Sequence, residues 1–453
     1  MEKQESLVFT VTRRSPELIT PAKPTPHEYK LLSDIDDQEG LRFQIPIIQF
    51  YRMSNNLLKM DPVKVIRDAL SETLVFYYPL AGRLREGAGR KLGVECTGEG
   101  VMFVEADANV TLDQFGDALQ PPFPCFQELL FDVPGSTGVL DCPLLHIQVT
   151  RLKCGGFIFA SRNNHTMCDA AGLVQFLTAL GEIARGASAP SILPVWQREL
   201  LTARDPPRIT CTHHQFNDVA NIDIPLDDIV HRSFFFGPTE ICALRQLVPP
   251  QLGKYSSFEL LTACLWRCCI RSLKLDPEEE VRICCLVNAR GRFNPPLLPV
   301  GYYGNAFVNP AAVTTAGKLC QNPIGYALKL VQKAKEDVTE EYIKSLADLM
   351  VLKGRPHYST AARIYVVLDL RHAGFGEVDF GWGRPAYGGP DRGEVMVSSY
   401  ISAKNKKGEN GILVPVYLPS FAMESFVVEL DSMLKNNDHL VIDDTLLHIR
   451  STL

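Results

Sequence analysis

The residue in this sequence with the clearest capacity for chemistry is His165, which lies in the run NHTMCD over residues 164–169. An imidazole exchanges a proton near neutral pH, so a histidine in a cleft can accept the proton of a weak nucleophile such as an alcohol. Most histidines nevertheless have structural roles, and an H-x-x-x-D pattern alone is not specific. The case for His165 therefore depends on its surroundings.

The elements on either side of His165 are predicted to be a hairpin and a helix. Apolar and polar residues alternate over 145–150, two glycines at 155–156 reverse the chain, and the apolar run 157–160 is typical of a buried return strand. Helical spacing follows, with Asp169 placed to cap the helix start. His165 is thus expected at a strand-to-helix turn, where its ring can project while its backbone is anchored.

Neighbouring cysteines and histidines offer weaker chemistry. Cys168 could be a nucleophile, but it is one of 13 cysteines, which show no C-x-x-C pair and stand scattered or in apolar surroundings. Such thiols are typically reduced and buried, and we expect a structural role for Cys168. His213 and His214 are interpreted as an exposed loop pair, and no metal site is expected.

Composition excludes several classes of protein. The chain has 453 residues, 46% hydrophobic and 22% charged, with a net charge of −6, so we expect a globular protein that does not bind nucleic acid. Uninterrupted apolar runs stay short of the roughly 18–20 residues of a membrane span. The first five residues lack the order of a signal peptide, and the final tripeptide is not the peroxisomal one. These features predict a soluble cytoplasmic protein without membrane partners.

The chain divides into three parts by composition and hydrophobic periodicity. Residues 187–228 carry five prolines among polar residues with little periodicity, which indicates a long crossover between an N-terminal lobe (1–186) and a C-terminal lobe (229–453). The second lobe is predicted to contain a strand and several helices, while 374–389 is too rich in glycine and proline for a helix. The predicted elements are a strand over 283–287 and helices over 257–273, 326–350 (one or two) and 421–434.

Two separated motifs resemble those of a known family. Residues 165–172 resemble the HxxxDG-type signature of the plant BAHD acyltransferases, with Ala170 in place of the usual glycine. The second signature, DFGWG, is complete at 379–383. Further agreement lies at residues 78–83, 286–290 and 301–305, so the resemblance covers essentially the full length. Within the family, the chain is similar to alcohol acyltransferases and benzyl alcohol O-benzoyltransferases.

This resemblance implies both a fold and an activity. The fold would be α/β, with two chloramphenicol-acetyltransferase-like lobes, each a mixed sheet flanked by helices, a long crossover loop and a central channel. The activity would be transfer of an acyl group from acyl-CoA to an alcohol in a ternary complex, with His165 as general base and no acyl-enzyme. Acyl-CoA would be a co-substrate and not a permanent cofactor, and the protein would be a cytosolic monomer.

The resemblance also implies roles for individual residues. Asp169 would point away from the substrates and pair with Arg290, which ties the lobes together. The DFGWG motif would form a structural loop near the coenzyme, through Asp379, Gly381, Trp382 and Gly383. The helix start at Ser256 and Ser257 would lie along the coenzyme channel, although it also fits a plain N-cap. From residue types, Gly304 and Asn305 could donate to the thioester oxygen.

Two alternative functions remain at this level. An N-acyltransferase of the same family would use an amine acceptor in place of an alcohol. A non-catalytic binding homologue would keep the fold without the reaction, and the intact His165 argues against it.

Overall fold

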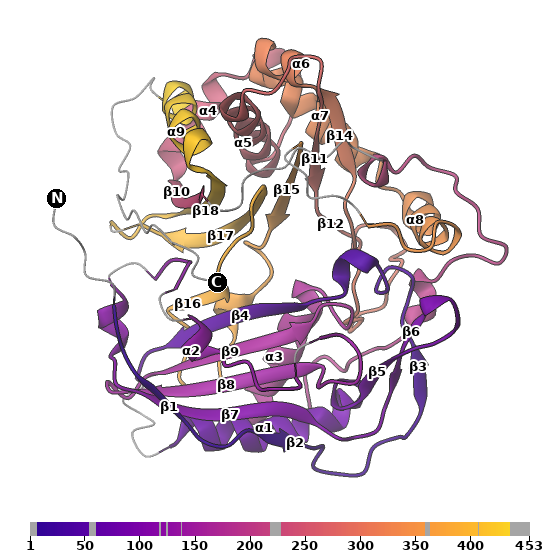
Figure 1. Ribbon diagram of the computed structural model, residues 1–453, viewed down its shortest axis with the longest axis vertical. Helices are drawn as coiled ribbons and strands as arrows, with labels where there is room; N and C mark the ends of the chain where they lie inside the picture. Colours follow the sequence, from indigo (N-terminus) through magenta and orange to yellow (C-terminus); the bar gives the residue numbers. More distant parts are fainter. Residues whose placement is uncertain are drawn as a thin grey trace.

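Two mixed β-sheets, each with helices on one face, form the body of the protein (Figure 1). The computed structural model describes residues 7–53, 60–116, 119–123, 126–136, 138–217, 228–357, 363–405 and 407–434. One sheet is built mainly from the first half of the chain and the other from the second half. This arrangement confirms the α/β expectation.

The first sheet has seven strands in the order β1-β7-β8-β9-β4-β16, with β2 also paired to β7. Only β7 and β8 are parallel among its pairs. Its strands are β1 (Val11–Arg13), β2 (Glu17–Ile19), β4 (Gln44–Tyr51), β7 (Val101–Ala108), β8 (Leu145–Leu152), β9 (Phe157–Asn164) and β16 (Tyr387–Pro390).

Both faces of this sheet are buried. Helices α1 (Pro62–Phe76) and α3 (Ala170–Ala184) cover one face, where Phe103 and Phe159 join their apolar side chains in one cluster. The other face packs against α2 (Phe126–Leu129) and against the second sheet, through Ile401 and Leu413. Because both faces are covered, these strands are largely apolar.

The predicted hairpin and helix around His165 are confirmed. Strands β8 and β9 pair antiparallel, and the turn between them uses Gly155 in a left-handed conformation with φ of +80°. Helix α3 begins directly after Asp169, whose side chain accepts a hydrogen bond from the backbone N–H of Gly172. His165 therefore lies in the five-residue turn that joins β9 to α3.

The second sheet has six strands in the order β10-β18-β17-β15-β11-β14. The sheet is mixed, because β15 runs parallel to both β11 and β17, whereas the other strand pairs of the sheet are antiparallel. Its strands are β10 (Ile229–Phe236), β11 (Glu280–Cys285), β14 (Ala311–Thr315), β15 (Ile364–Asp369), β17 (Val397–Lys404) and β18 (Asn410–Pro419).

Helices cover the outer face of the second sheet (Figure 1). The central one, α5, starts with the predicted capping box, in which Ser256 and Glu259 bond each other's backbone N–H. The predicted helical stretch 326–350 is two helices, because Thr339 caps a new start. The helices on this face are α4 (Pro238–Gln246), α5 (Ser257–Leu273), α6 (Ala316–Gln321), α7 (Ile324–Glu336) and α9 (Ser420–Leu434). Helix α8 (Glu340–Leu352) packs instead with the crossover, β12 and β13.

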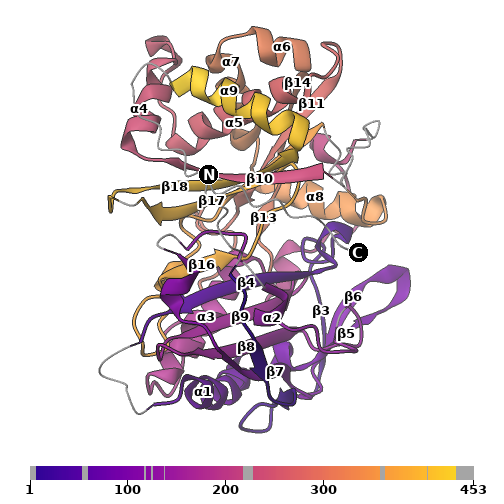
Figure 2. The same ribbon diagram turned by 60° about the vertical axis from the view of Figure 1, so that its left-hand side comes forward.

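Two features connect the halves. Strand β16 belongs by sequence to the second half but pairs antiparallel with β4 of the first sheet, as Figure 2 shows. The crossover, described to residue 217, contains only short 3-10 turns. Smaller sheets complete the fold: β3 (Tyr29–Leu31), β5 (Arg83–Glu86) and β6 (Leu92–Glu95) form one, and β12 (Val287–Asn288) and β13 (Phe307–Val308) form the other.

Candidate active site

His165 is held by backbone contacts from both halves of the chain. Its N–H donates to the carbonyl oxygen of Phe43 at 2.9 Å, and its own carbonyl oxygen accepts from the Asn305 side-chain amide at 2.8 Å. The imidazole lies between two aromatic rings, with centroid distances of 5.3 Å to Phe43 and 6.0 Å to Phe307. The ring thus lies between the residue that precedes β4 and the first residue of β13.

The surroundings of the imidazole favour its neutral form. The residue is partly exposed, while its Nδ1 atom is buried and makes no hydrogen bond within the described part of the chain. Burial lowers the pKa of His165 below its ordinary value, and the negative charges of Asp169 and Asp36 oppose this shift only in part. A neutral imidazole at pH 7 can accept a proton, as a general base must.

Both carboxylate oxygens of Asp169 accept hydrogen bonds from groups other than the His165 ring. Oδ1 accepts from the Gly172 N–H at 2.9 Å, and Oδ2 accepts from Arg290 at 2.7 Å and from the Ala306 N–H at 2.9 Å. The Arg290 ion pair that the family resemblance implied is therefore present. It joins the start of α3 to the loop between β12 and β13.

Arg290 also fixes the loop that approaches α3. Its Nε donates to the carbonyl oxygen of Tyr302 at 3.1 Å, and its Nη2 donates to that of Gly304. The approach is close, since a Cβ atom on Gly172 would lie 2.0 Å from the Tyr303 carbonyl oxygen. Glycine at position 172 is what permits this contact between the halves.

Asn305 has a different task from the one its residue type suggested. It is fully buried, its backbone N–H and side-chain amide both donate to Asp36, and the amide also reaches the His165 carbonyl. These donors are already engaged, so the expectation that Asn305 donates to a thioester oxygen is corrected. Gly304 has no room for a side chain, because a Cβ atom there would lie 1.4 Å from the Arg198 guanidinium, and its role as a donor stays a prediction.

The DFGWG motif forms a tight loop against the first sheet. Asp379 Oδ1 accepts from the backbone N–H of Gly381 at 2.7 Å and of Gly383 at 2.8 Å. Both glycines have a left-handed φ, +113° and +84°. Trp382 packs edge-on against Phe157 of β9 with centroids 5.3 Å apart. These contacts give the motif a packing role on the strand that leads to His165.

Ser256 and Ser257 both have partners at the start of α5. Ser256 Oγ caps the Glu259 N–H at 3.2 Å, and Arg245 donates to Ser257 Oγ at 3.1 Å. Glu259 also accepts from Lys335 at 2.5 Å. The N-cap is therefore present, and none of these hydrogen bonds runs to the His165 turn. The expected place of this helix start along the coenzyme channel stays a prediction.

Two residues that the sequence analysis missed lie directly behind His165. Asp36 and Arg198 form an ion pair at 2.8 Å with both side chains almost fully buried. Asp36 holds Asn305, and Arg198 donates to the Met167 carbonyl oxygen at 2.8 Å. The only sequence signal was the concentration of carboxylates at positions 34, 36 and 37, within an otherwise mixed segment.

The remaining reactive side chains have structural surroundings. Burial raises the pKa of Cys168 to about 12, so its thiol is protonated at neutral pH. His213 is not exposed as expected: it is buried, and its Nε2 lies 3.0 Å from Ser345 Oγ. The sequence could not reveal that α8 packs over this loop. Within the described ranges, no group of three or more His, Cys, Asp or Glu side chains could hold a metal ion.

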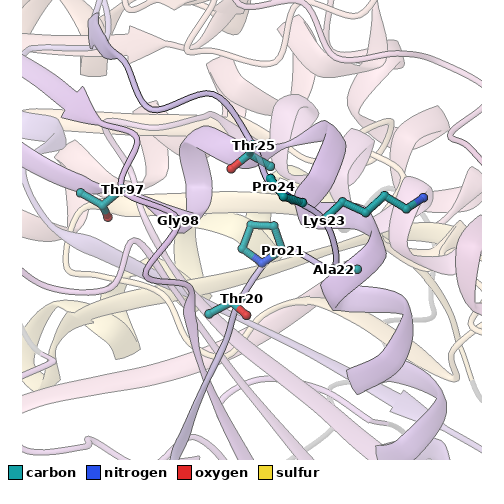
Figure 3. Close-up of a pocket in the computed structure, with 8 residues that line it drawn as sticks. All are labelled: Thr20, Pro21, Ala22, Lys23, Pro24, Thr25, Thr97 and Gly98. Carbon is teal, nitrogen blue, oxygen red and sulfur yellow. The ribbon is translucent and has the colours of Figure 1, made fainter.

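One cavity, of about 370 Å³, lies elsewhere in the first half (Figure 3). It is formed by residues 20–25, after β2, together with Thr97 and Gly98. None of the residues predicted to be functional contributes to it, so it is not the candidate site. Among the helices of the described residues, none has the length and apolar character needed to cross a membrane.

Comparison with known proteins gives consistent results for sequence and fold. A model described as Transferase family matches residues 9–433. The benzyl alcohol O-benzoyltransferase of Nicotiana tabacum is 70% identical over 442 residues, which cover 96% of each chain. The crystal structure of vinorine synthase superposes with a TM-score of 0.72 at 23% identity, covering 94% of this chain and 98% of that one. F. sporotrichioides TRI101, crystallised with coenzyme A and T-2, gives a TM-score of 0.64 at 16% identity, covering 88% and 97%.

The two solved structures confirm the α/β fold over most of the chain, and the sequence matches show the family. The match spans both motifs, the β9–α3 turn with His165 and the loop at 379–383. The chain therefore belongs to the Transferase family of BAHD acyltransferases.

Proposed function

We propose that this protein is an acyl-CoA:alcohol O-acyltransferase that forms esters, with His165 as the general base. The observation that carries the proposal is the imidazole at the β9–α3 turn, partly exposed, with a lowered pKa and a backbone fixed from both halves. The relative at 70% identity is named for the transfer of a benzoyl group to benzyl alcohol. The enzyme class follows from membership of the family, whereas the roles of individual residues are what we propose.

The proposed reaction needs only a proton acceptor at the site. The alcohol oxygen attacks the thioester carbonyl carbon while His165 takes the hydroxyl proton, which avoids a free alkoxide. The tetrahedral intermediate then releases the coenzyme thiolate as the C–S bond breaks, and the imidazolium returns the proton to that sulfur. The products are an ester and free coenzyme A. General-base catalysis of this kind typically contributes about 10²–10⁴-fold, or roughly 3–5 kcal/mol of barrier.

Aromatic side chains beside His165 support an aromatic acceptor or acyl group. Phe43 is 41% exposed although its ring lies 5.3 Å from the imidazole, and Phe307 lies on the other side. Exposed aromatic surface beside a base offers an apolar wall on which a benzyl or benzoyl ring can pack. Benzoyl-CoA with benzyl alcohol is therefore the first pair to test, and other small acyl-CoAs and aliphatic alcohols follow.

Further assignments belong to this proposal. The two lobes would be 1–186 and 229–453 with the crossover 187–228 between them, acyl-CoA would be a co-substrate, and the protein would act as a cytoplasmic monomer. Asp169 and Arg290 would maintain the site by joining the lobes, as their ion pair suggests. The loop of Asp379, Gly381, Trp382 and Gly383 would support the coenzyme side of the site. Ser256 and Ser257 would lie along the coenzyme path and contribute through the helix start.

The test compares His165→Ala with His214→Ala, a histidine substitution on the crossover. Coenzyme A release is measured with benzoyl-CoA, with and without benzyl alcohol. We expect the His165 variant to lose about 10²–10⁴-fold in kcat with an unchanged circular dichroism spectrum. The His214 variant should match the wild type. Near-normal turnover of the His165 variant would contradict the proposal, and a preference for benzylamine over benzyl alcohol would favour N-acylation.

A further inference from the structure

Asp36 is a buried carboxylate that collects donors from three parts of the chain. It is fully buried, and its oxygens accept from the Ser33 hydroxyl at 2.6 Å and from Arg198 at 2.8 and 3.0 Å. Its Oδ1 also accepts from the Asn305 backbone N–H at 2.8 Å and from the Asn305 side-chain amide at 2.9 Å. The N-terminal segment, the crossover and the second half of the chain therefore meet at one side chain.

The partners of Asp36 continue to the turn that carries the candidate base. The Asn305 amide donates onward to the carbonyl oxygen of His165 at 2.8 Å. Arg198 donates through its other nitrogen to the carbonyl oxygen of Met167 at 2.8 Å. Each donor is bonded to Asp36 and to the turn at the same time. The carbonyl oxygens of His165 and Met167 are thus bonded by two donors that share a single carboxylate.

Two neighbouring carboxylates in this segment serve as a comparison, because their contacts stabilise the fold without reaching the turn. Asp34 is also buried, and it pairs with Lys91 at 2.5 Å and accepts from the Ala203 N–H at 2.8 Å. Asp37 pairs with Arg42 and Arg355, both at 2.8 Å. These contacts tie down the edge of the small sheet, the crossover and the end of α8. Among the described residues, neither carboxylate bonds the 165–169 turn or a residue that does.

We infer that Asp36 is a positioning residue for His165, acting through Asn305 and Arg198 to set where the imidazole stands. The inference rests on the proposed function, because it assigns a task only if His165 is the base. A positioning role differs from a fold-stabilising role, because it predicts a loss of kcat that is larger than the loss of stability explains.

Replacing Asp36 by asparagine removes the charge while keeping the shape. Arg198 is then left buried without its counter-charge, and Asn305 loses the acceptor that aligns its amide. A displacement of about 1 Å at a reacting group can cost about 10²-fold in rate. The binding of acyl-CoA should change little, because Asp36 is fully buried and cannot contact a ligand.

A change in pH dependence should accompany the loss of rate. The charged groups around His165 are Asp169, paired with Arg290, and Asp36, paired with Arg198. Both carboxylates raise the pKa of the imidazole against the larger effect of burial. Without the Asp36 charge the pKa of His165 falls further, so the acidic limb of kcat/KM moves to lower pH. A defect confined to stability would leave this limb in place.

The experiment compares Asp36→Asn with Asp34→Asn as the matched control, measuring kcat, KM for benzoyl-CoA, the pH profile and thermal unfolding. We expect Asp36→Asn to lose about 10²-fold in kcat with KM within about threefold, and to shift the acidic limb downward. Asp34→Asn should be destabilised yet keep the kcat and the limb of the wild type. Equal losses of kcat in both variants, or an unmoved limb in Asp36→Asn, would overturn the inference.

A second variant covers the case in which Asp36→Asn does not fold. Asn305→Ser keeps both members of the Asp36–Arg198 ion pair and the Asn305 backbone N–H bond to Asp36, and it removes the amide that donates to Asp36 and to His165, so we expect a kcat loss with retained structure. Wild-type kcat in this variant would overturn the inference. The His165→Ala variant separates the two proposals: if it stays active, the proposed function fails, and if it is inactive while Asp36→Asn is normal, only the role of Asp36 fails.

Discussion

The ion pair between Asp169 and Arg290 should contribute measurably to the free energy of unfolding, and Asp169→Ala tests this contribution. The substitution removes the N-cap of α3, worth about 1 kcal/mol, and the acceptor of the buried Ala306 N–H, worth about another 1 kcal/mol. It also leaves Arg290 unpaired. That cost is about 2 kcal/mol, below the usual range for a buried pair, because the Arg290 side chain is 21% exposed. We expect the free energy of unfolding to fall by about 4 kcal/mol.

Two further variants separate the contributions to this value. Asp169→Asn keeps one oxygen that can cap α3, but it replaces the oxygen that accepts from Arg290 and from the Ala306 N–H by an NH2 group, so about 3 kcal/mol should be lost. Thr339→Ala removes the N-cap of α8, where Thr339 Oγ1 accepts from the Tyr342 N–H at 3.1 Å, and should cost about 1 kcal/mol. The ion pair is thus isolated by comparing the three.

Urea unfolding followed by tryptophan fluorescence measures these differences, provided that the slope of each transition matches that of the wild type. Coenzyme A release should fall together with stability in Asp169→Ala. If Asp169→Ala costs no more than Thr339→Ala, the pair contributes nothing beyond a helix cap. The idea that it joins the lobes would then be wrong.

Two other predictions follow from the site. Because His165 must be neutral to accept a proton and burial lowers its pKa, kcat/KM should fall on the acidic side with a midpoint below pH 6.5, as the pH drops through the lowered pKa. A pH–rate profile with its acidic midpoint above 6.5 would contradict this. Gly172→Ala should lower the free energy of unfolding by about 1–3 kcal/mol, since its Cβ would lie 2.0 Å from the Tyr303 carbonyl oxygen. In thermal unfolding, Gly376→Ala is the control, because a Cβ there meets no atom within 4 Å, and equal effects of the two would refute the steric argument.

The sequence predicted best the parts of the site that depend on neighbouring residues. The hairpin of β8 and β9, the cap by Asp169 and the start of α5 all follow from turn chemistry and periodicity within short segments. The family resemblance added the partner of Asp169, which no local pattern could supply.

Long-range contacts account for what could not be predicted. Asn305 donates to Asp36, which is 269 residues away in the chain, so nothing near Asn305 revealed that its amide was already engaged. The burial of His213 depends in the same way on α8, which follows it by more than a hundred residues. Residue type indicates what a side chain can do, whereas its partners decide whether it is free to do so.

Strand β16 limits how this enzyme can be recombined with its relatives. A chimera joined at the crossover takes β4 from one parent and β16 from the other, although the two strands share a register from Tyr387 opposite Phe50 to Pro390 opposite Ile47. Mismatched side chains between these two strands would weaken the pairing of β16 at the edge of the first sheet. The N-terminal half of one parent is therefore better transplanted together with residues 387–390 of the same parent.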